Sequence, residues 1–268
     1  MRLDLIASSL VLALVVLPLL AWKWRIKMGM AVVAAVVVGP LTSLIVSQVD
    51  LASGGLKLPV LLPIEFVFIL MIPFLVVIIR FYRDPERHPR ETKNVILAPA
   101  DGQVIYVNRV EKGSSLVSTK GGRKFRLDEI AATNLLAGAN YLVGIDMNLL
   151  NVHVNRSPIA GKALLRKRTS GKFISLRKPE SEVVNERLTT IISNGRFSVG
   201  VIQIASRLVR TIVTYVKEGD SLQIGQRIGA IVFGSQVDVA IPELDSLKIE
   251  VKVGDEVKAG VSVIARYG

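Results

Sequence analysis

The sequence predicts a β-dominated (α+β) soluble domain of barrel-sandwich type with internal repeats, preceded by two or three transmembrane helices. Three observations lead to this fold class. Long apolar stretches are confined to residues 1–80, short Val- and Ile-rich runs follow from residue 94 onward, and two segments near the C-terminus resemble each other. We therefore expect a membrane anchor over residues 1–80 and a folded domain over residues 81–268.

The anchor contains three apolar stretches, near residues 5–22, 28–48 and 58–79. A helix needs roughly 20 apolar residues to cross a bilayer, so each stretch is long enough. A cleaved signal peptide is the alternative for the first stretch, but no small-x-small cleavage site follows it. Gly39-Pro40 allows a kink or a re-entrant hairpin in the second. The third has one ionisable residue, Glu65, which we expect to be packed or interfacial.

Basic residues around these stretches predict the orientation in the membrane. Only Lys57 lies between the second and third stretches, whereas the other two flanks hold Lys23, Arg25 and Lys27, and Arg80, Arg83, Arg87 and Arg90. Cytoplasmic flanks are the ones enriched in Lys and Arg. We therefore expect a multi-pass protein of the cell membrane with its soluble domain in the cytoplasm.

The soluble domain is predicted to consist of short strands. Val- and Ile-rich runs such as GQVIYVNRV, FSVGVIQIA and RIGAIVFG are bounded by Gly, Asp or Asn, and one helix is expected over 128–136. VKEGDSLQIGQRIGAI (216–231) is echoed by VKVGDEVKAGVSVIA (251–265), and APADGQVIYV more weakly by SPIAGKALLR. Such repeats are typical of lipoyl- and biotinyl-carrier domains, but the Met-Lys-Met tip of those carriers is absent.

Composition restricts the chemistry that the domain can perform. The net charge is +12, and the lack of a nucleic-acid motif favours an anionic membrane surface over nucleic acid. No cysteine and only two histidines, His88 and His153, are present, so no metal site is expected. A site must then use residues such as Ser235, whose nucleophilicity requires a base. His153 is the candidate base, with a satisfied structural histidine as the alternative.

Two further residues have both a structural and a chemical interpretation. Asp101, in APADGQV, is either part of a tight turn or the carboxylate that orients the base. Gly234-Ser235 interrupts the strand-like run IVFGSQVDVAIP, where an isolated glycine usually marks a bulge or a close backbone approach. Each signal is weak alone, and their combination points to a site.

The order of five motifs resembles that of phosphatidylserine decarboxylase proenzymes, in the short branch whose cleavage motif is Phe-Gly-Ser. The motifs are FYRDPER, APADGQV, NVHVNRSPIAG, NERL and VKEGDSLQIGQRIGAIVFGSQVD, spanning residues 81–242. Gln236 departs from this branch, which often has Arg there.

This resemblance implies a function for the Gly-Ser interruption. It implies self-cleavage between Gly234 and Ser235 into a β chain of residues 1–234 and an α chain of 235–268. Ser235 would become a covalent pyruvoyl cofactor, with His153 as general base and acid and Asp101 orienting it. The substrate would be phosphatidylserine or archaetidylserine, decarboxylated to the ethanolamine lipid. Arg156 and Arg210 match basic positions of the family and are candidates for substrate binding.

One alternative comes from a different class of protein. A non-catalytic, membrane-anchored barrel-sandwich adaptor would share the predicted fold. Long coiled-coil heptads are missing and the basic flanks favour the cytoplasm, and both observations oppose this alternative. The predicted partners are a serine phospholipid and the α and β chains of one precursor, and a homo-oligomer is compatible with the sequence.

Overall fold

The computed structural model describes residues 2–24, 26–110, 116–119, 122–136, 138–172, 174–176, 178, 180–205, 211–232 and 235–268. The chain forms two compact units. One contains residues 1–83 and 148–150, and the other contains residues 84–147 and 151–268.

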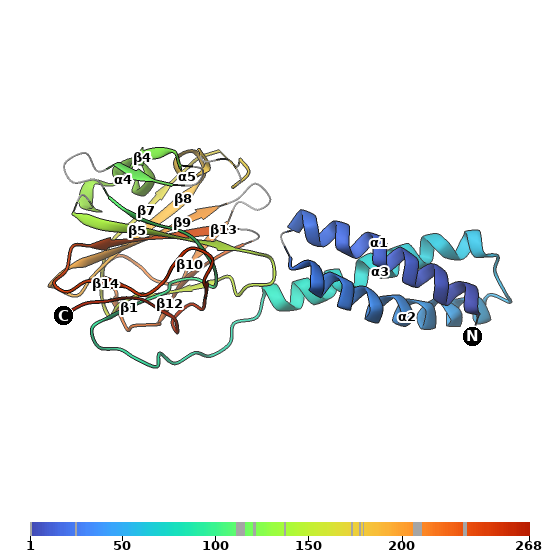
Figure 1. The fold of residues 1–268 in the computed structure, drawn as a ribbon. Helices are drawn as coiled ribbons and strands as arrows, with labels where there is room; N and C mark the ends of the chain where they lie inside the picture. The colour runs from blue at the N-terminus through green and yellow to red at the C-terminus, as the bar shows by residue number, and fades with distance from the viewer. Residues whose placement is uncertain are drawn as a thin grey trace. The chain divides into compact units, whose positions relative to one another are not determined.

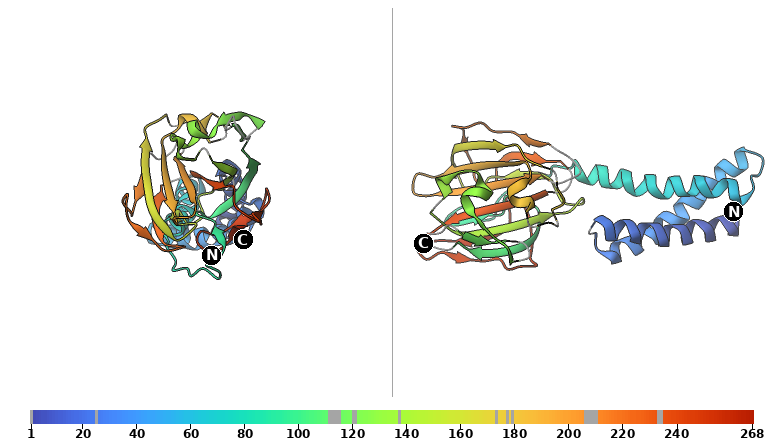
Figure 2. Two further views of the ribbon diagram at one scale, coloured as in Figure 1. Left: turned by 90° about the vertical axis from the view of Figure 1, so that its left-hand side faces the viewer. Right: turned by 90° about the horizontal axis from the view of Figure 1, so that it is seen from above.

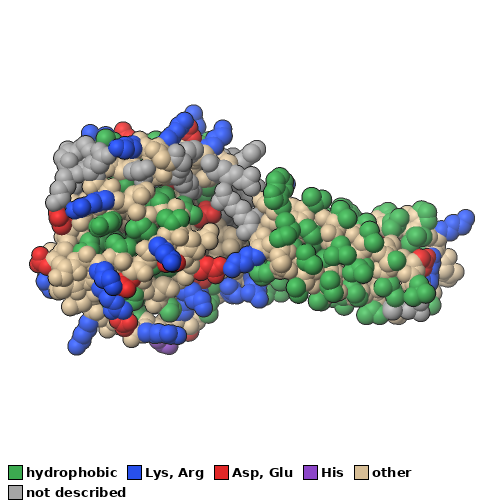
Figure 3. Space-filling view, in the orientation of Figure 1, with side chains coloured by type: hydrophobic (Ala, Val, Ile, Leu, Met, Phe, Trp, Pro, Cys, Tyr) green, Lys and Arg blue, Asp and Glu red, His purple; other side chains and the backbone are tan. Residues whose placement is uncertain are grey.

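The first unit is made of three long helices, α1 (Leu3–Trp24), α2 (Met28–Ala52) and α3 (Leu58–Phe81) (Figure 1). Each is long and apolar enough to cross a membrane. Hydrophobic side chains cover most of the visible face of this unit (Figure 3). α2 continues through Gly39 and Pro40, so the structure shows one helix where the sequence also allowed a re-entrant hairpin.

Two close contacts hold these helices together. A Cβ atom on Gly39 would lie 2.9 Å from Leu10 Cα, which shows that α1 and α2 approach closely at this glycine. Glu65 of α3 is fully buried, and Ser8 Oγ of α1 donates a hydrogen bond to its carboxylate at 2.9 Å. The expected packed position of Glu65 is confirmed.

The second unit is built on a curled, antiparallel sheet of eight strands (Figures 1 and 2). In spatial order the strands are β11 (Ser221–Leu222), β7 (Gly161–Thr169), β8 (Arg187–Ser193), β9 (Ser198–Ala205), β13 (Ser235–Pro242), β5 (Ala139–Met147), β2 (Gly102–Arg109) and β15 (Glu256–Val257). The predicted strand-rich domain behind long apolar helices is confirmed.

Three smaller sheets complete this unit. Their strands, again in spatial order, are β1 (Val95–Leu97), β16 (Val263–Arg266) and β14 (Lys248–Ile249); β10 (Ile212–Thr214), β12 (Arg227–Ile231) and β6 (Val154–Arg156); and β3 (Leu116–Ser118) with β4 (Lys124–Arg126). The helix expected over 128–136 is shorter. It forms α4 (Leu127–Ala131), because Ala132 takes a left-handed backbone with φ of 53°, and a 3-10 turn, η2 (Asn134–Leu136), follows.

Strand alternation divides the core between the two faces of the large sheet. On β13, Val237, Val239 and Ile241 pack into one cluster with residues of β1, β7 to β9 and β12, whereas Ala240 packs into the other with Ile202. Because successive side chains point to opposite faces, residues 235 and 237 share one face and residues 236 and 238 the other.

The two similar segments form equivalent turns. Gly219 and Gly254 have φ values of +94° and +98°, which favour glycine. In each turn an aspartate accepts a hydrogen bond from a lysine backbone N–H, at 2.7 Å for Lys217–Asp220 and 3.0 Å for Lys252–Asp255.

The loops that these segments contact are also equivalent. Gly225 N donates to Ser157 O at 2.9 Å, and Gly260 N donates to Ala98 O at 2.8 Å. The two loops also bond to each other reciprocally, through Leu97 N to Pro158 O at 2.9 Å and Arg156 N to Pro99 O at 2.8 Å. The predicted internal repeat is therefore confirmed as a repeat of hydrogen bonds.

Candidate active site

The predicted cleavage point lies at the start of a central strand. β13 begins at Ser235, which pairs with Met147 of β5 on one side and Ala205 of β9 on the other. Gly234 and the side chain of Ser235 lie outside the described residues. Pairing on both sides places the backbone of residue 235 in the interior of the sheet, away from its edges.

Backbone pairing brings His153 to the segment that leads into this strand. His153 immediately precedes β6, and β6 pairs antiparallel with β12. The His153 carbonyl accepts a hydrogen bond at 3.1 Å from the N–H of Ile231, the last residue of β12. Ile231 comes four positions before Ser235 in the sequence, so the His153 backbone is bonded to the described segment that precedes the cleavage point.

The imidazole of His153 is buried and held as one tautomer. Its Nδ1 lies 2.9 Å from the carbonyl oxygen of Asn151. Because a carbonyl only accepts, Nδ1 carries the hydrogen and Nε2 has the basic lone pair. Burial lowers the pKa of His153 to about 4, although the hydrogen bond to Asn151 and the negative charge of Asp101 act in the opposite direction. At neutral pH the ring is an uncharged base.

Asp101 connects three distant segments of the chain. Its carboxylate is 5% exposed and accepts two hydrogen bonds from the Arg87 guanidinium, one of them at 2.8 Å. It also accepts from Ala259 N at 2.8 Å and from Val152 N at 3.4 Å. The structure thus links Asp101 to His153 through the backbone at Val152 and through its charge. The role of Asp101 in orienting the imidazole remains a prediction.

Sequence reasoning missed Arg87, which it used only as a basic flank of the third apolar stretch. The Arg87 side chain is 11% exposed, forms a two-pronged ion pair with Asp101 and donates to Ala259 O at 3.0 Å. Bidentate geometry of this kind fixes the position of a carboxylate as well as its charge. The motif FYRDPER contains this arginine and was the available signal.

Arg156, a candidate for substrate binding, is engaged within the protein. It is 3% exposed, and burial lowers its pKa. Its guanidinium donates to Gly225 O and Pro85 O, both at 3.0 Å, and lies 3.4 Å from Asp84. These contacts give Arg156 a structural role in holding the segment that contains Arg87. Arg210, the other candidate, lies outside the described residues.

Two buried amides lie on the face of the large sheet that residue 235 shares. Gln203 of β9 pairs in register with Val237, and its Nε2 donates to Asn155 Oδ1 at 2.7 Å. Asn155 Nδ2 donates to Pro99 O at 3.4 Å and lies 4.0 Å from the sulfur of Met147. Both amides are at most 1% exposed. A glutamine within the apolar run VIQIA was the signal that could have identified Gln203.

The opposite face next to the cleavage point is also polar. Gln236 Nε2 donates to Tyr106 Oη at 2.9 Å and to Asp238 Oδ1 at 2.7 Å, and lies 3.4 Å from Glu182. Burial, followed by the charges of Asp238 and Glu182, raises the pKa of Tyr106 well above its ordinary value. Gln236, where the short branch often has Arg, therefore lies between two buried acidic residues.

The described residues suit a pyruvoyl group at position 235 better than a metal. Among them, no group of three or more His, Asp or Glu side chains is placed to hold a metal ion. A pyruvoyl group needs a nearby proton carrier and neutral hydrogen-bonding groups around a ketone. The neutral His153 and the buried amides of Asn155 and Gln203 are of this type.

Comparison with known proteins gives one consistent result. Residues 74–265 match the family model for phosphatidylserine decarboxylase. A provisionally named archaetidylserine decarboxylase proenzyme of Methanocaldococcus jannaschii is 40% identical over 201 residues, which cover 75% of this chain and 95% of the relative.

Bacterial relatives show the same similarity. A phosphatidylserine decarboxylase proenzyme of Trichlorobacter lovleyi is 37% identical over 194 residues, covering 71% of this chain and 77% of the relative. That of Desulfotalea psychrophila is 31% identical over 204 residues, covering 76% and 84%. The chain belongs to the phosphatidylserine decarboxylase family of pyruvoyl-dependent carboxy-lyases.

Proposed function

We propose that this chain is the precursor of a membrane-bound enzyme that cuts itself between Gly234 and Ser235 and decarboxylates a serine phospholipid. The observation that carries this proposal is the bond between His153 O and Ile231 N, at 3.1 Å. It holds a buried, neutral histidine beside the segment that leads to residue 235.

Self-cleavage begins with proton transfer to His153. Nε2 takes the proton of the Ser235 hydroxyl, and the oxygen attacks the Gly234 carbonyl carbon. Glycine has no Cβ to hinder this approach. The acyl group moves from nitrogen to oxygen, and His153 returns the proton to the released amine. The peptide bond is thereby replaced by an ester.

Elimination then separates the two chains. The Ser235 Cβ–O bond breaks as the Cα proton is removed, which leaves a free carboxyl on Gly234 and dehydroalanine at position 235. One water molecule then hydrolyses the dehydroalanine, which releases its nitrogen as ammonia and leaves a pyruvoyl group. The α chain of residues 235–268 then begins with this group, and the β chain contains residues 1–234.

The chain's own residues prepare the site for decarboxylation. A pyruvoyl group supplies a ketone that binds the substrate amine and accepts electrons as carbon dioxide leaves. His153 holds a transferable proton at Nε2 for the carbon that loses the carboxylate. Asn155 and Gln203 present neutral amides on the same face of the sheet. These amides can orient polar groups of the substrate through hydrogen bonds, and they add no charge that would compete with the substrate carboxylate.

The substrate we propose is a phospholipid with a serine headgroup. The relatives are named for phosphatidylserine and for archaetidylserine, which share this headgroup and differ in their hydrocarbon chains. The three apolar helices would keep the enzyme in the membrane that contains the lipid, and the basic flanks support a cytoplasmic location for the β-rich unit.

The intact mass of the purified, denatured protein tests self-cleavage. We expect two chains, of residues 1–234 and 235–268, the smaller with a pyruvoyl N-terminus. Ser235→Ala and His153→Ala should each give a single chain of 29.2 kDa. Ser221→Ala, an exposed serine in β11, is the matched control and should be cleaved as the natural chain is. A cleaved Ser235→Ala protein would refute the scheme, and an uncleaved natural chain would favour the adaptor alternative.

A lipid assay tests the reaction and its substrate separately. The cleaved protein is incubated with vesicles that contain either phosphatidylserine or an ether-linked archaeal serine lipid. Mass spectrometry then follows the appearance of each ethanolamine lipid. Conversion of neither lipid by a fully cleaved protein would contradict the decarboxylase proposal while leaving self-cleavage intact.

A further inference from the structure

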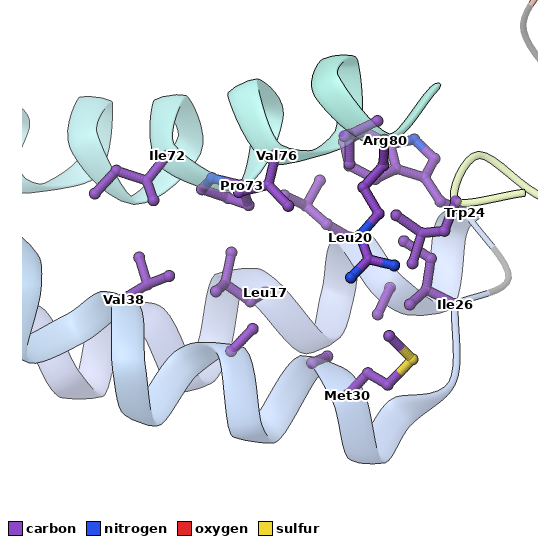
Figure 4. Close-up of a pocket in the computed structure, with 15 residues that line it drawn as sticks. Leu17, Leu20, Trp24, Ile26, Met30, Val38, Ile72, Pro73, Val76 and Arg80 are labelled. Atoms are coloured by element: carbon purple, nitrogen blue, oxygen red, sulfur yellow. The ribbon is translucent and has the colours of Figure 1, made fainter. Parts of the chain in front are cut away.

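An apolar pocket opens between the three helices of the first unit (Figure 4). Leu17, Leu20 and Trp24 of α1 form one wall, and Met30 of α2 with Ile72 and Val76 of α3 form the others. Met30 is 50% exposed and Val76 is 48% exposed. The pocket is therefore open at the surface of the bundle, where a membrane would place hydrocarbon chains.

Arg80 is the one charged residue among those that line this pocket. Figure 4 shows its guanidinium turned from α3 into the space between the helices. Within the described part of the chain no carboxylate pairs with it. A cation beside an apolar surface at membrane depth is costly unless an anion accompanies it. The planar guanidinium matches the geometry of a phosphate.

Trp24 indicates the depth of this charged group. The last turn of α1 contains Lys23 and ends at Trp24, and the last turn of α3 contains Arg80. Trp and basic residues are enriched where a transmembrane helix meets the headgroup layer. The pocket therefore extends from Arg80 and Trp24 at the interface toward apolar side chains deeper in the helices. A lipid has the same order, with its charged headgroup at the interface and its hydrocarbon chain below.

We propose that this pocket binds one anionic phospholipid, with the headgroup phosphate on Arg80 and one hydrocarbon chain against Leu17, Leu20 and Ile72. The proposal depends on insertion of the helices into a membrane and not on the decarboxylation chemistry. It assigns to the anchor a binding function in addition to attachment.

Quenching of Trp24 fluorescence tests this proposal directly. The chain has two tryptophans, so Trp22→Phe leaves Trp24 as the sole reporter. The full-length protein is placed in phosphatidylcholine vesicles with increasing fractions of phosphatidylglycerol brominated in its acyl chains, or of phosphatidylcholine brominated in the same way. Because one basic residue favours an anionic lipid about fivefold, brominated phosphatidylglycerol should reach half-maximal quenching at about a fivefold lower fraction.

Charge variants separate the pocket from general surface attraction. Arg80→Gln should make the two brominated lipids equal, and Arg80→Lys should keep most of the preference. Lys23→Gln removes a charge from an exposed residue at the same end of α1, outside the pocket, and should reduce the preference less than Arg80→Gln does, because solvent and ions screen the exposed charge. Equal loss from Lys23→Gln and Arg80→Gln would overturn the proposal.

A filling variant tests the hydrocarbon site. Ala34 of α2 lines the pocket, and Ala34→Phe should remove the saturable quenching by both brominated lipids while circular dichroism shows unchanged helix content. Persistent saturable quenching in a folded Ala34→Phe protein would refute the pocket as the binding site. Absence of preferential quenching in the Trp22→Phe protein itself would also refute it, and would indicate that a second copy or another helix covers the pocket.

Discussion

The internal repeat has two copies, of which the first combines residues 94–107 with 251–267 and the second combines residues 153–166 with 216–231. In the first copy, the loop over residues 98–102 accepts a backbone hydrogen bond from the turn at Gly260. In the second, the loop over residues 157–161 accepts the turn at Gly225. The residue before the first strand of each copy also accepts an equivalent backbone hydrogen bond. Asn94 O accepts from Tyr267 N and His153 O accepts from Ile231 N, both at 3.1 Å. The two copies, which are far apart in the sequence, thus share one set of backbone hydrogen bonds.

The two copies differ in the side chains placed on this common backbone. Asp101 precedes the loop glycine in the first copy and is buried, whereas the exposed Ala160 occupies the matching place in the second. Conversely, His153 of the second copy matches Asn94 of the first. The candidate site therefore takes one ionisable group from each copy. Its chemistry depends on a few side chains that break the likeness between the copies.

The largest expected effect comes from removing the charge that distinguishes the first copy. Asp101→Asn should slow self-cleavage, but by less than the roughly 10⁴-fold loss seen for a triad aspartate, because Asn151 O and not Asp101 accepts from His153 Nδ1 and holds the tautomer. Timed gel analysis of freshly synthesised precursor measures the rate. Ala160→Asp, which places a carboxylate in the other copy, should cleave normally. Normal cleavage of a folded Asp101→Asn protein would remove Asp101 from the mechanism.

Arg87→Gln should next destabilise the first copy. It leaves the carboxylate of Asp101 buried without its cation, which costs about 3–5 kcal/mol for a buried pair. Thermal unfolding followed by circular dichroism measures the loss. Combining Arg87→Gln with Asp101→Asn should destabilise less than the sum of the two changes, because the unpaired charge is then gone. Strict additivity would show that the ion pair contributes little.

The pH dependence should follow the histidine of the second copy, because Asn94 does not titrate. With the pKa of His153 lowered to about 4, self-cleavage should be constant from pH 8 to about 5. It should fall about tenfold per pH unit below the pKa of the base.

Stability should change in the same direction. The folded pKa of His153 lies below its value of 6.5 when unfolded, so the unfolded chain binds more protons between the two values. This contribution to stability is full above pH 6.5 and is lost as the pH falls toward 4. His153→Asn should flatten that part of the stability curve, and an unchanged curve would contradict the lowered pKa.

The smallest expected effects test whether the turns at Gly219 and Gly254 are equivalent. Gly219→Ala and Gly254→Ala place a side chain at equivalent positive φ, with no atom within 4 Å of either new Cβ. Each should cost about 1–2 kcal/mol of unfolding free energy through backbone strain alone. Clearly unequal losses in chemical denaturation would show that the two turns are not equivalent.

Local sequence patterns predicted much of this fold. Apolar stretches of membrane length, the glycine-aspartate turns and the echo of 216–231 in 251–265 each depend on neighbouring residues. The helix over 128–136 was predicted too long, because its acidic start is a local signal, while nothing in the sequence marks Ala132 for the left-handed backbone that ends α4. Motif order selected Asp101, His153 and Ser235 together as candidates, although none was distinctive alone.

The contacts around those residues could not be predicted in the same way. Asp101 accepts from Ala259, 158 residues away in the sequence, and Gln203 reaches Asn155 across 48 residues. Arg87 and Arg156 look alike as isolated arginines, yet Arg87 forms a two-pronged ion pair with Asp101, whereas Arg156 donates to two backbone carbonyls and lies 3.4 Å from Asp84. Only the folded arrangement of strands distinguishes such partners.

The position of β13 determines whether the protein could refold once it has been cleaved. It is hydrogen-bonded on both sides, to β5 and β9, and the strands that follow it, β15 and β16, pair with β2 and β1. Cleavage before β13 would convert one folding chain into two that are interwoven. Refolding after denaturation then requires an encounter between separate molecules and becomes dependent on concentration. Maturation would thus be a one-way event, because the folding route that built the precursor is no longer available to its products.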